Sequence, residues 1–153
     1  MGSGDLNITS ALRNTKRIYI DSAPLIYFVE RHRDYFTKMS RIIALIESAP
    51  LQAFTSVITI TEIIVQPLKV GNTDLAQEYH DVLVSSNQFT LLSVTEDIAI
   101  TAGAIRARYS LRTPDALHVA TAIATGCDTI LTNDAAMKRV TDLNVVYMDD
   151  LEP

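Results

Sequence analysis

The stretch RTPDALHVATAIATGCDTILTND, residues 112–134, decides the fold class of this 153-residue chain. Pro114 near its start and Gly126 near its end bound a run of apolar residues and alanines, which predicts a buried helix. The segment DTILTN at 128–133 then predicts a strand, because it is rich in β-branched and apolar residues. A helix that leads directly into a strand is a building unit of an α/β protein.

Strand-like and helix-like runs alternate along the rest of the chain. Further strands are predicted at residues 17–21, 51–55, 88–94 and 144–148, and further helices at residues 22–30, 34–48, 56–67, 73–87, 95–109 and 134–140. This alternation is typical of βαβ units, so we expect an α/β fold: a three-layer α/β/α sandwich with a central, mostly parallel sheet. We expect residues 1–15 to form a flexible N-terminal arm, in which MGSG at 1–4 is interpreted as a cloning remnant, and residues 16–153 to form one domain.

The composition is that of a soluble globular protein, with 48% apolar and 20% charged residues. No apolar run approaches the roughly 20 residues that a membrane-spanning helix requires. The single Cys127 can form no internal disulfide, so a reducing cytoplasm is the expected compartment. The net charge of −5 gives no support for a nucleic-acid partner, but it does not exclude one, since four acids in one metal site would leave −1 on the rest of the chain.

Four carboxylates occupy positions at which an α/β fold would bring them together. Asp21 ends a predicted strand, Asp134 follows another, Asp115 lies in the first turn of a helix, and Glu62 lies within the apolar run TSVITITEIIV. The carboxyl ends of parallel strands meet at one edge of a sheet, where ligands bind. An unpaired buried carboxylate is costly, and clusters of carboxylate oxygens are what Mg²⁺ and Mn²⁺ prefer. The pattern therefore predicts a divalent-metal site and metal-dependent phosphodiester chemistry.

With these acids in place, residues from about Arg17 to Leu151 resemble a PIN domain, specifically the small stand-alone VapC-type toxins of toxin–antitoxin pairs. The matching segments are IYIDSAPLIYFVE (18–30), TSVITITEIIVQPLK (55–69), RTPDALHVATAIATGCDTILTND (112–134) and NVVYMDDL (144–151). The resemblance implies a three-layer α/β/α fold, a Mg²⁺- or Mn²⁺-dependent endoribonuclease that cleaves RNA, a homodimer, and an antitoxin protein as partner. Its acidic site would consist of Asp21, Glu62, Asp115 and Asp134.

Neighbouring side chains are expected to support this site. Thr132, Asn133 and Ser22, with Ser56 next, are candidates for orienting the metal ligands by hydrogen bonds. Arg112 precedes Asp115 closely and is the candidate for contact with an RNA phosphate. His118 lies one turn after Asp115, but in an alanine-rich helix it is expected to be packed rather than bound to metal.

Two other functions stay open at this stage. A phosphoryl-transfer enzyme of the haloacid-dehalogenase type would need a second aspartate at position 23, where the chain has Ala23, and the receiver type would need a lysine after residues 145–148. A non-catalytic PIN-like module that binds protein or RNA would keep the same fold. Titration with Mn²⁺ would separate such a module from a metal-dependent enzyme.

Overall fold

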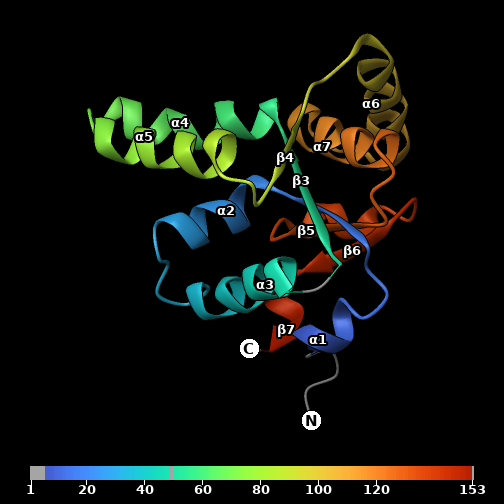
Figure 1. The fold of residues 1–153 in the computed structure, drawn as a ribbon. Helices are drawn as coiled ribbons and strands as arrows, with labels where there is room; N and C mark the ends of the chain where they lie inside the picture. The colour runs from blue at the N-terminus through green and yellow to red at the C-terminus, as the bar shows by residue number, and fades with distance from the viewer. Residues whose placement is uncertain (1–5, 49, 153) are drawn as a thin grey trace.

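Five parallel strands form the centre of the molecule in the order β4-β3-β2-β5-β6. The computed structural model describes residues 6–48 and 50–152 (Figure 1). The strands of this sheet are β2 (Arg17–Ile20), β3 (Gln52–Ser56), β4 (Thr90–Leu92), β5 (Thr129–Thr132) and β6 (Asn144–Tyr147). The predicted α/β sandwich around a parallel sheet is therefore confirmed.

Helices cover both faces of the sheet because side chains along each strand alternate between the two faces. In β2, Ile18 and Ile20 belong to the apolar cluster beneath α2 (Ser22–Val29) and α3 (Phe36–Ser48), whereas Tyr19 belongs to the cluster beneath α6 (Glu96–Tyr109) and α7 (Thr113–Ala124). The two clusters together bury both faces of the sheet, as the near-continuous apolar strands of a parallel sheet require.

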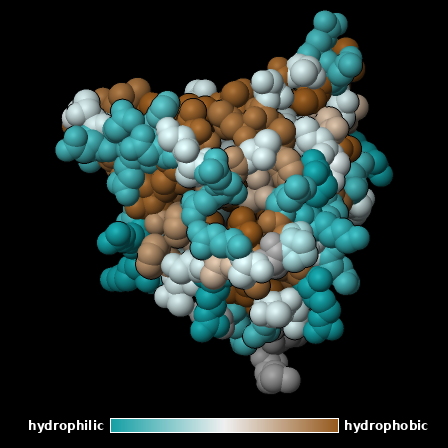
Figure 2. Space-filling model, viewed as in Figure 1, coloured by the Kyte–Doolittle hydropathy of each residue, from teal (hydrophilic) through white to brown (hydrophobic). Residues whose placement is uncertain are grey.

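A pair of helices projects to one side of this sandwich (Figure 1). These are α4 (Val57–Lys69) and α5 (Thr73–His80), the second of which continues into a π-helical turn, η1 (Asp81–Ser85). We call residues 57–85 the α4–α5 arm. Figure 2 shows apolar residues gathered on its surface, and the large exposed apolar side chains of the arm are Val57, Val65, Leu68, Val70 and Val84.

The N-terminal segment differs from the flexible arm expected for residues 1–15. Residues 1–5 lie outside the described part of the chain. Residues Leu6–Asn7 form β1, which pairs in parallel with β7 (Leu151–Glu152), and α1 (Ile8–Ala11) follows directly. Ile8 and Leu12 are both buried, and their spacing of four residues places them on one face of the helical turn. Two apolar side chains and a strand pairing thus hold this segment against the core.

Several element boundaries also differ from the predictions. The helix expected at 73–87 ends as an α-helix at His80 and changes to π-helix, and the strand expected at 88–94 is limited to Thr90–Leu92. The second difference follows from the position of β4, an edge strand that has only β3 as a neighbour. The remaining short elements are the 3₁₀ turns η2 (Ala135–Arg139) and η3 (Met148–Asp150). Within the described residues, every helix is too short or too polar to cross a bilayer.

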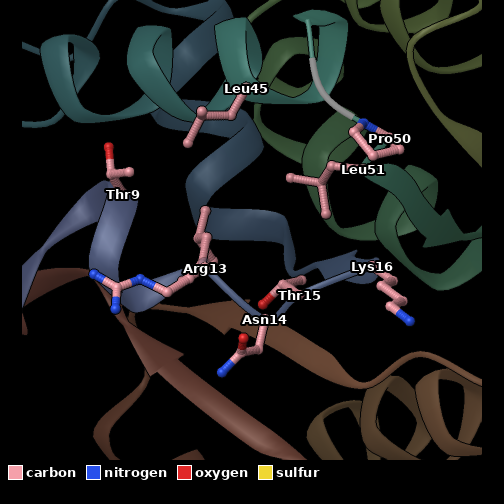
Figure 3. Close-up of a pocket in the computed structure, with 9 residues that line it drawn as sticks. Thr9, Arg13, Asn14, Thr15, Lys16, Leu45, Pro50 and Leu51 are labelled. Atoms are coloured by element: carbon pink, nitrogen blue, oxygen red, sulfur yellow. The ribbon is translucent and has the colours of Figure 1, made fainter.

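A cleft of about 550 Å³ lies at the amino ends of the strands, next to Lys16 and Leu51, which precede β2 and β3 (Figure 3). Apolar groups and uncharged polar groups line most of it, and Arg13 and Lys16 supply its charge. None of the described residues that line it is a carboxylate, and the strand ends that carry the predicted acids lie at the opposite edge of the sheet. The cleft is therefore separate from the edge that carries the predicted acids.

Candidate active site at the carboxyl edge of the sheet

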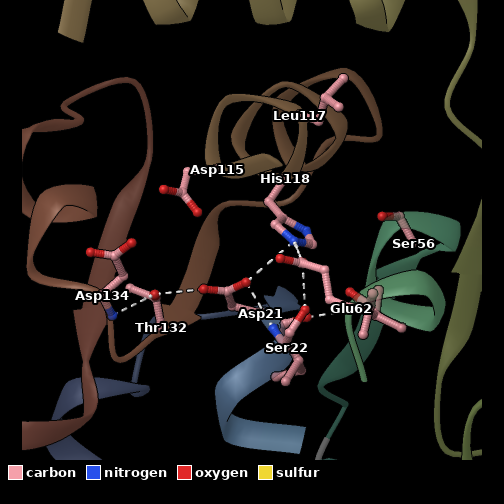
Figure 4. A network of polar contacts seen from close by, with 12 residues as sticks. Asp21, Ser22, Ser56, Glu62, Asp115, Leu117, His118, Thr132 and Asp134 are labelled. Carbon is pink, nitrogen blue, oxygen red and sulfur yellow. Dashed lines mark hydrogen bonds and ion pairs between the residues drawn. The ribbon is translucent and has the colours of Figure 1, made fainter. Parts of the chain in front are cut away.

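The predicted acids lie at the carboxyl ends of the central strands β2 and β5 and on two helices that reach this edge (Figure 4). Asp21 directly follows β2, and Asp134 follows β5, the neighbour of β2. Asp115 lies in the first turn of α7, and Glu62 lies in the middle of α4. The topology thus brings together residues that are more than a hundred positions apart in the sequence.

Asp21 is the most firmly held of the acids. It caps α2, where its Oδ1 accepts a hydrogen bond from the backbone N–H of Ser22 at 2.8 Å. Its Oδ2 accepts from the hydroxyl of Thr132, also at 2.8 Å, and the residue is 7% exposed. The backbone of Ser22 and the hydroxyl of Thr132 thus hold the Asp21 carboxylate in place, and their predicted role toward a bound ion stays a prediction.

Glu62 and Asp21 are joined through His118. The Nε2 atom of His118 lies 2.5 Å from Oε1 of Glu62 and 3.4 Å from Oδ1 of Asp21. The hydroxyl of Ser22 donates to the same Glu62 oxygen at 2.8 Å. Among the described residues, Asp21, Glu62 and His118 form a group in which one ligand atom from each lies within 4.8 Å of the other two. Such a spacing would allow a single cation to contact all three.

A buried polar network lies beneath His118 and had not been recognised in the sequence. The hydroxyl of Tyr19 donates to Oγ of Ser56 at 2.8 Å and lies 2.7 Å from Nδ1 of His118. Tyr19, Ser56 and His118 are all 0% exposed. The alternation of β2 was the available signal, because Tyr19 lies on the same side of the strand as Asp21. Ser56 is thus linked to the site through its hydrogen bond with Tyr19.

Asp115 and Asp134 form a second half of the site, and Arg112 bridges them. Nε of Arg112 lies 3.2 Å from Oδ2 of Asp115, and Nη2 lies 3.9 Å from Oδ2 of Asp134. Asp134 is also held by its own turn, since its Oδ1 accepts from the backbone N–H of Ala136 at 3.0 Å. Without a bound ion, the arginine is therefore the cation that neutralises these two acids.

The predicted role of Asn133 is not reflected in its contacts. Its side-chain amide donates to the hydroxyl of Tyr27 at 3.0 Å, and its side-chain oxygen accepts from the backbone N–H of Asp149 at 3.2 Å. These bonds tie α2 to η3 and do not reach the four acids.

The site perturbs the pKa values of its own groups. Burial raises the pKa of Asp115, and the charges of Asp134 and Asp21 raise it further, against the opposing effect of Arg112. Burial disfavours the charged form of His118, but the hydrogen bond to Glu62 and the charge of Asp21 outweigh it and raise the pKa of the imidazole. Burial likewise opposes ionisation of Glu62, yet the hydrogen bond from His118 is strong enough to lower the pKa of that carboxyl. Acids that raise the pKa of a neighbouring carboxyl, and an imidazole whose pKa is raised by two carboxylates, are typical of a functional site.

Comparisons with known proteins agree with this architecture. A toxin–antitoxin complex from Klebsiella pneumoniae contains a chain with 24% sequence identity and a TM-score of 0.64, in an alignment that covers 84% of this chain and 95% of that one. The structure of VapBC2 from Rickettsia felis, bound to a DNA fragment of its promoter, gives 18% identity and a TM-score of 0.68, with 86% and 98% covered. VapC20 from Mycobacterium tuberculosis, a sarcin-ricin loop cleaving toxin, gives 16% identity and a TM-score of 0.65, with 83% and 98% covered. At these identities the likeness is one of fold.

Comparison with curated protein sequences gave no significant match. The profile of one protein family does match, over residues 18–143 and thus over most of the chain, and that family is the PIN domain. The matched region contains all four predicted acids, His118 and Arg112. The chain therefore belongs to the PIN domain family.

Proposed function

We propose that this protein is an endoribonuclease that depends on a divalent cation, and that it is the toxin of a toxin–antitoxin pair. The observation that carries the proposal is the meeting of Asp21 and Glu62 with a buried imidazole at the carboxyl edge of the sheet, with Asp115 and Asp134 beside them. Membership in the PIN family and the toxin folds that the chain resembles support the same conclusion.

The residues present suit Mg²⁺ or Mn²⁺. The donor set is rich in carboxylate oxygens, which these ions prefer, and burial and the neighbouring acids raise the pKa of Asp115 although Arg112 pairs with it. Asp21, Glu62, Asp115 and Asp134 would hold the ion. A bound divalent cation would neutralise charge on the scissile phosphate and lower the pKa of a water molecule.

The chain's own side chains have distinct parts in the proposed reaction. Thr132 and the Ser22 backbone fix the Asp21 carboxylate, so that its oxygens need not reorganise when substrate binds. Glu62, whose side chain is 32% exposed, is open enough for a carboxylate oxygen to orient the attacking water by a hydrogen bond. Arg112, whose side chain is 75% exposed, can turn from the acids to donate hydrogen bonds to a substrate phosphate.

The α4–α5 arm supports the proposal of a protein partner. Its large exposed apolar side chains are valines and one leucine between Val57 and Val84, and exposed apolar surface of this kind is typical of protein–protein contacts (Figure 2). We propose that the arm contacts a second copy of the chain in a homodimer, to which the antitoxin also binds. Light scattering on the purified protein tests the dimer, and Leu68→Asp should shift it to monomer.

Cleavage of structured RNA by the purified protein, with Mg²⁺ or Mn²⁺ supplied, tests the proposed activity. Asp21→Asn should lower the cleavage rate by at least about 100-fold, because a metal contributes several kcal/mol to stabilising the transition state. Asp97→Asn is the matched control, since this exposed acid lies in the first turn of α6, away from the site. Equal cleavage by the Asp21 and Asp97 variants would refute the assignment, provided that circular dichroism shows both to be folded.

A further inference from the structure

His118 is the only nitrogen donor in the group of close ligand atoms described above, and its place there has no explanation in core packing alone. Its ring is 0% exposed, yet its Nε2 points out of the core toward Glu62 and Asp21 (Figure 4). Asp115 lies one helical turn earlier, so both side chains reach the same edge of the sheet from one face of α7. A packed histidine would need no carboxylates around it.

The network beneath the ring determines which nitrogen faces the acids. The Tyr19 hydroxyl gives its hydrogen to Ser56, so the hydrogen in the contact between Tyr19 and His118 comes from Nδ1 of the imidazole. Metal-binding histidines are oriented in this way, with one ring nitrogen donating to a fixed partner and the other directed at the ion. Nε2 is therefore the nitrogen left for a ligand, and it already lies between two carboxylates.

We propose that Nε2 of His118 is a direct ligand of the bound cation, together with Asp21 and Glu62. The proposal rests on the proposed function, in that the acidic edge must bind a divalent ion at all. A mixed set of nitrogen and oxygen donors selects first-row transition-metal dications over Mg²⁺, which strongly prefers oxygen. The chain is thus a nuclease whose ion is of the transition-metal class, for which Mn²⁺ is the probe.

A comparison of Mg²⁺ and Mn²⁺ binding distinguishes a His118 that binds the ion from a His118 that only holds Glu62 in place. A histidine that only positions Glu62 would affect Mg²⁺ and Mn²⁺ binding equally, because it would act through an oxygen ligand common to both ions. A histidine bound to the ion affects mainly the transition metal. The ratio of the two affinities is therefore the quantity to measure.

Electron spin-echo spectroscopy of the full-length protein with bound Mn²⁺ tests the proposal without any activity assay. A directly bound imidazole nitrogen modulates the echo, and incorporation of ¹⁵N-labelled histidine should change that modulation. His118→Gln should remove it, whereas His80→Gln, a change at an exposed residue of the α4–α5 arm, should leave it intact. An echo without nitrogen modulation in the unaltered protein would overturn the proposal.

Calorimetric titration supplies the second measurement. His118→Gln should weaken Mn²⁺ binding by about 10-fold or more and Mg²⁺ binding by less than about 3-fold. Should His118→Gln fail to fold, Tyr19→Phe keeps the ring but removes its orienting partner, and it should weaken Mn²⁺ more than Mg²⁺. An equal loss of both ions would refute ligation by His118 while leaving the acidic site in place. Failure of the unaltered protein to bind either ion would instead refute the proposed function itself.

Discussion

Tyr19→Phe is the most informative single substitution in the site, because it removes one oxygen atom and keeps the packed ring. That oxygen lies 2.8 Å from Oγ of Ser56 and 2.7 Å from Nδ1 of His118, at a position closed to solvent. Without that oxygen, Ser56 and His118 would remain buried but would each lose a hydrogen-bond partner. A buried polar group left without a hydrogen bond costs about 1–3 kcal/mol. Two such groups give a loss of about 2–4 kcal/mol in the free energy of unfolding, once the easier burial of phenylalanine is allowed for.

Urea unfolding followed by circular dichroism, with EDTA present, measures this loss. In thermal unfolding, the melting temperature of the variant should be lower by about 5–15 °C, since each kcal/mol of lost stability corresponds to about 2–4 °C for a chain of this length. Ser56→Ala should cost less, about 1 kcal/mol, because Tyr19 keeps its contact with His118. In the Ser56→Ala background, Tyr19→Phe should then cost less than it does alone, by at least about 0.5 kcal/mol.

Tyr147→Phe is the matched control. Its hydroxyl lies 3.4 Å from Oδ2 of Asp149 at the surface, so its removal should change stability by less than about 0.5 kcal/mol. If Tyr19→Phe were as mild as this control, the hydroxyl would not constrain Ser56 or His118, and the account of the buried network would be wrong.

Three further predictions concern the charges of the site. Arg112→Ala should raise the affinity for Mg²⁺ by about two- to fivefold, because the ion no longer competes with the guanidinium for Asp115 and Asp134; titration calorimetry checks this, and a weaker affinity would contradict it. Asp115→Asn should raise the melting temperature of the EDTA-treated protein by a few degrees, because burial and neighbouring acids raise the pKa of Asp115 and so disfavour its charged form. The stability of the EDTA-treated protein should also depend on pH through His118. Its folded-state pKa is raised above 6.5, so its contribution is complete below pH 6.5 and is lost as the pH rises through the folded value, with a slope of at most about 1.4 kcal/mol per pH unit.

Glu62 should make the stability of the protein depend on pH in the opposite direction. The pKa of this carboxyl is lowered below 4.5, so its contribution is present above pH 4.5 and is lost as the pH falls through the folded value. Urea midpoints measured between pH 4 and 9 should therefore pass through a maximum, and His118→Gln should flatten the alkaline side. An alkaline side that is unchanged by the substitution would show that another group causes it.

Much of the fold and the acidic edge could be predicted, because the signals for them are local. The predicted strand at 17–21 is found at Arg17–Ile20, and the acid that follows it lies at the edge where parallel strands place ligands. The contacts of His118 could not be predicted in the same way. Its spacing from Asp115 indicates a shared helix face, but its partner Glu62 is 56 residues away, and only the packing of α7 near α4 brings the two together.

The ordered segment at residues 6–12 was missed for a related reason. Its strand pairs with Leu151–Glu152, at the other end of the chain, and a two-residue strand has no recognisable period of its own. The bridging role of Arg112 was missed as well, because a basic residue before a helix is equally suited to hold acids or to contact a phosphate. Only the distances to Asp115 and Asp134 show which of these it does in the protein without substrate.

The position of β2 between β3 and β5 has a consequence for synthesis of the protein. Asp21 is translated early, whereas Thr132, whose hydroxyl steadies that carboxylate, is translated 111 residues later. A polypeptide still attached to its ribosome therefore carries Asp21 without the neighbouring strand that completes its surroundings. The acidic edge is therefore completed only after β5 has been synthesised, when nearly the whole polypeptide has emerged.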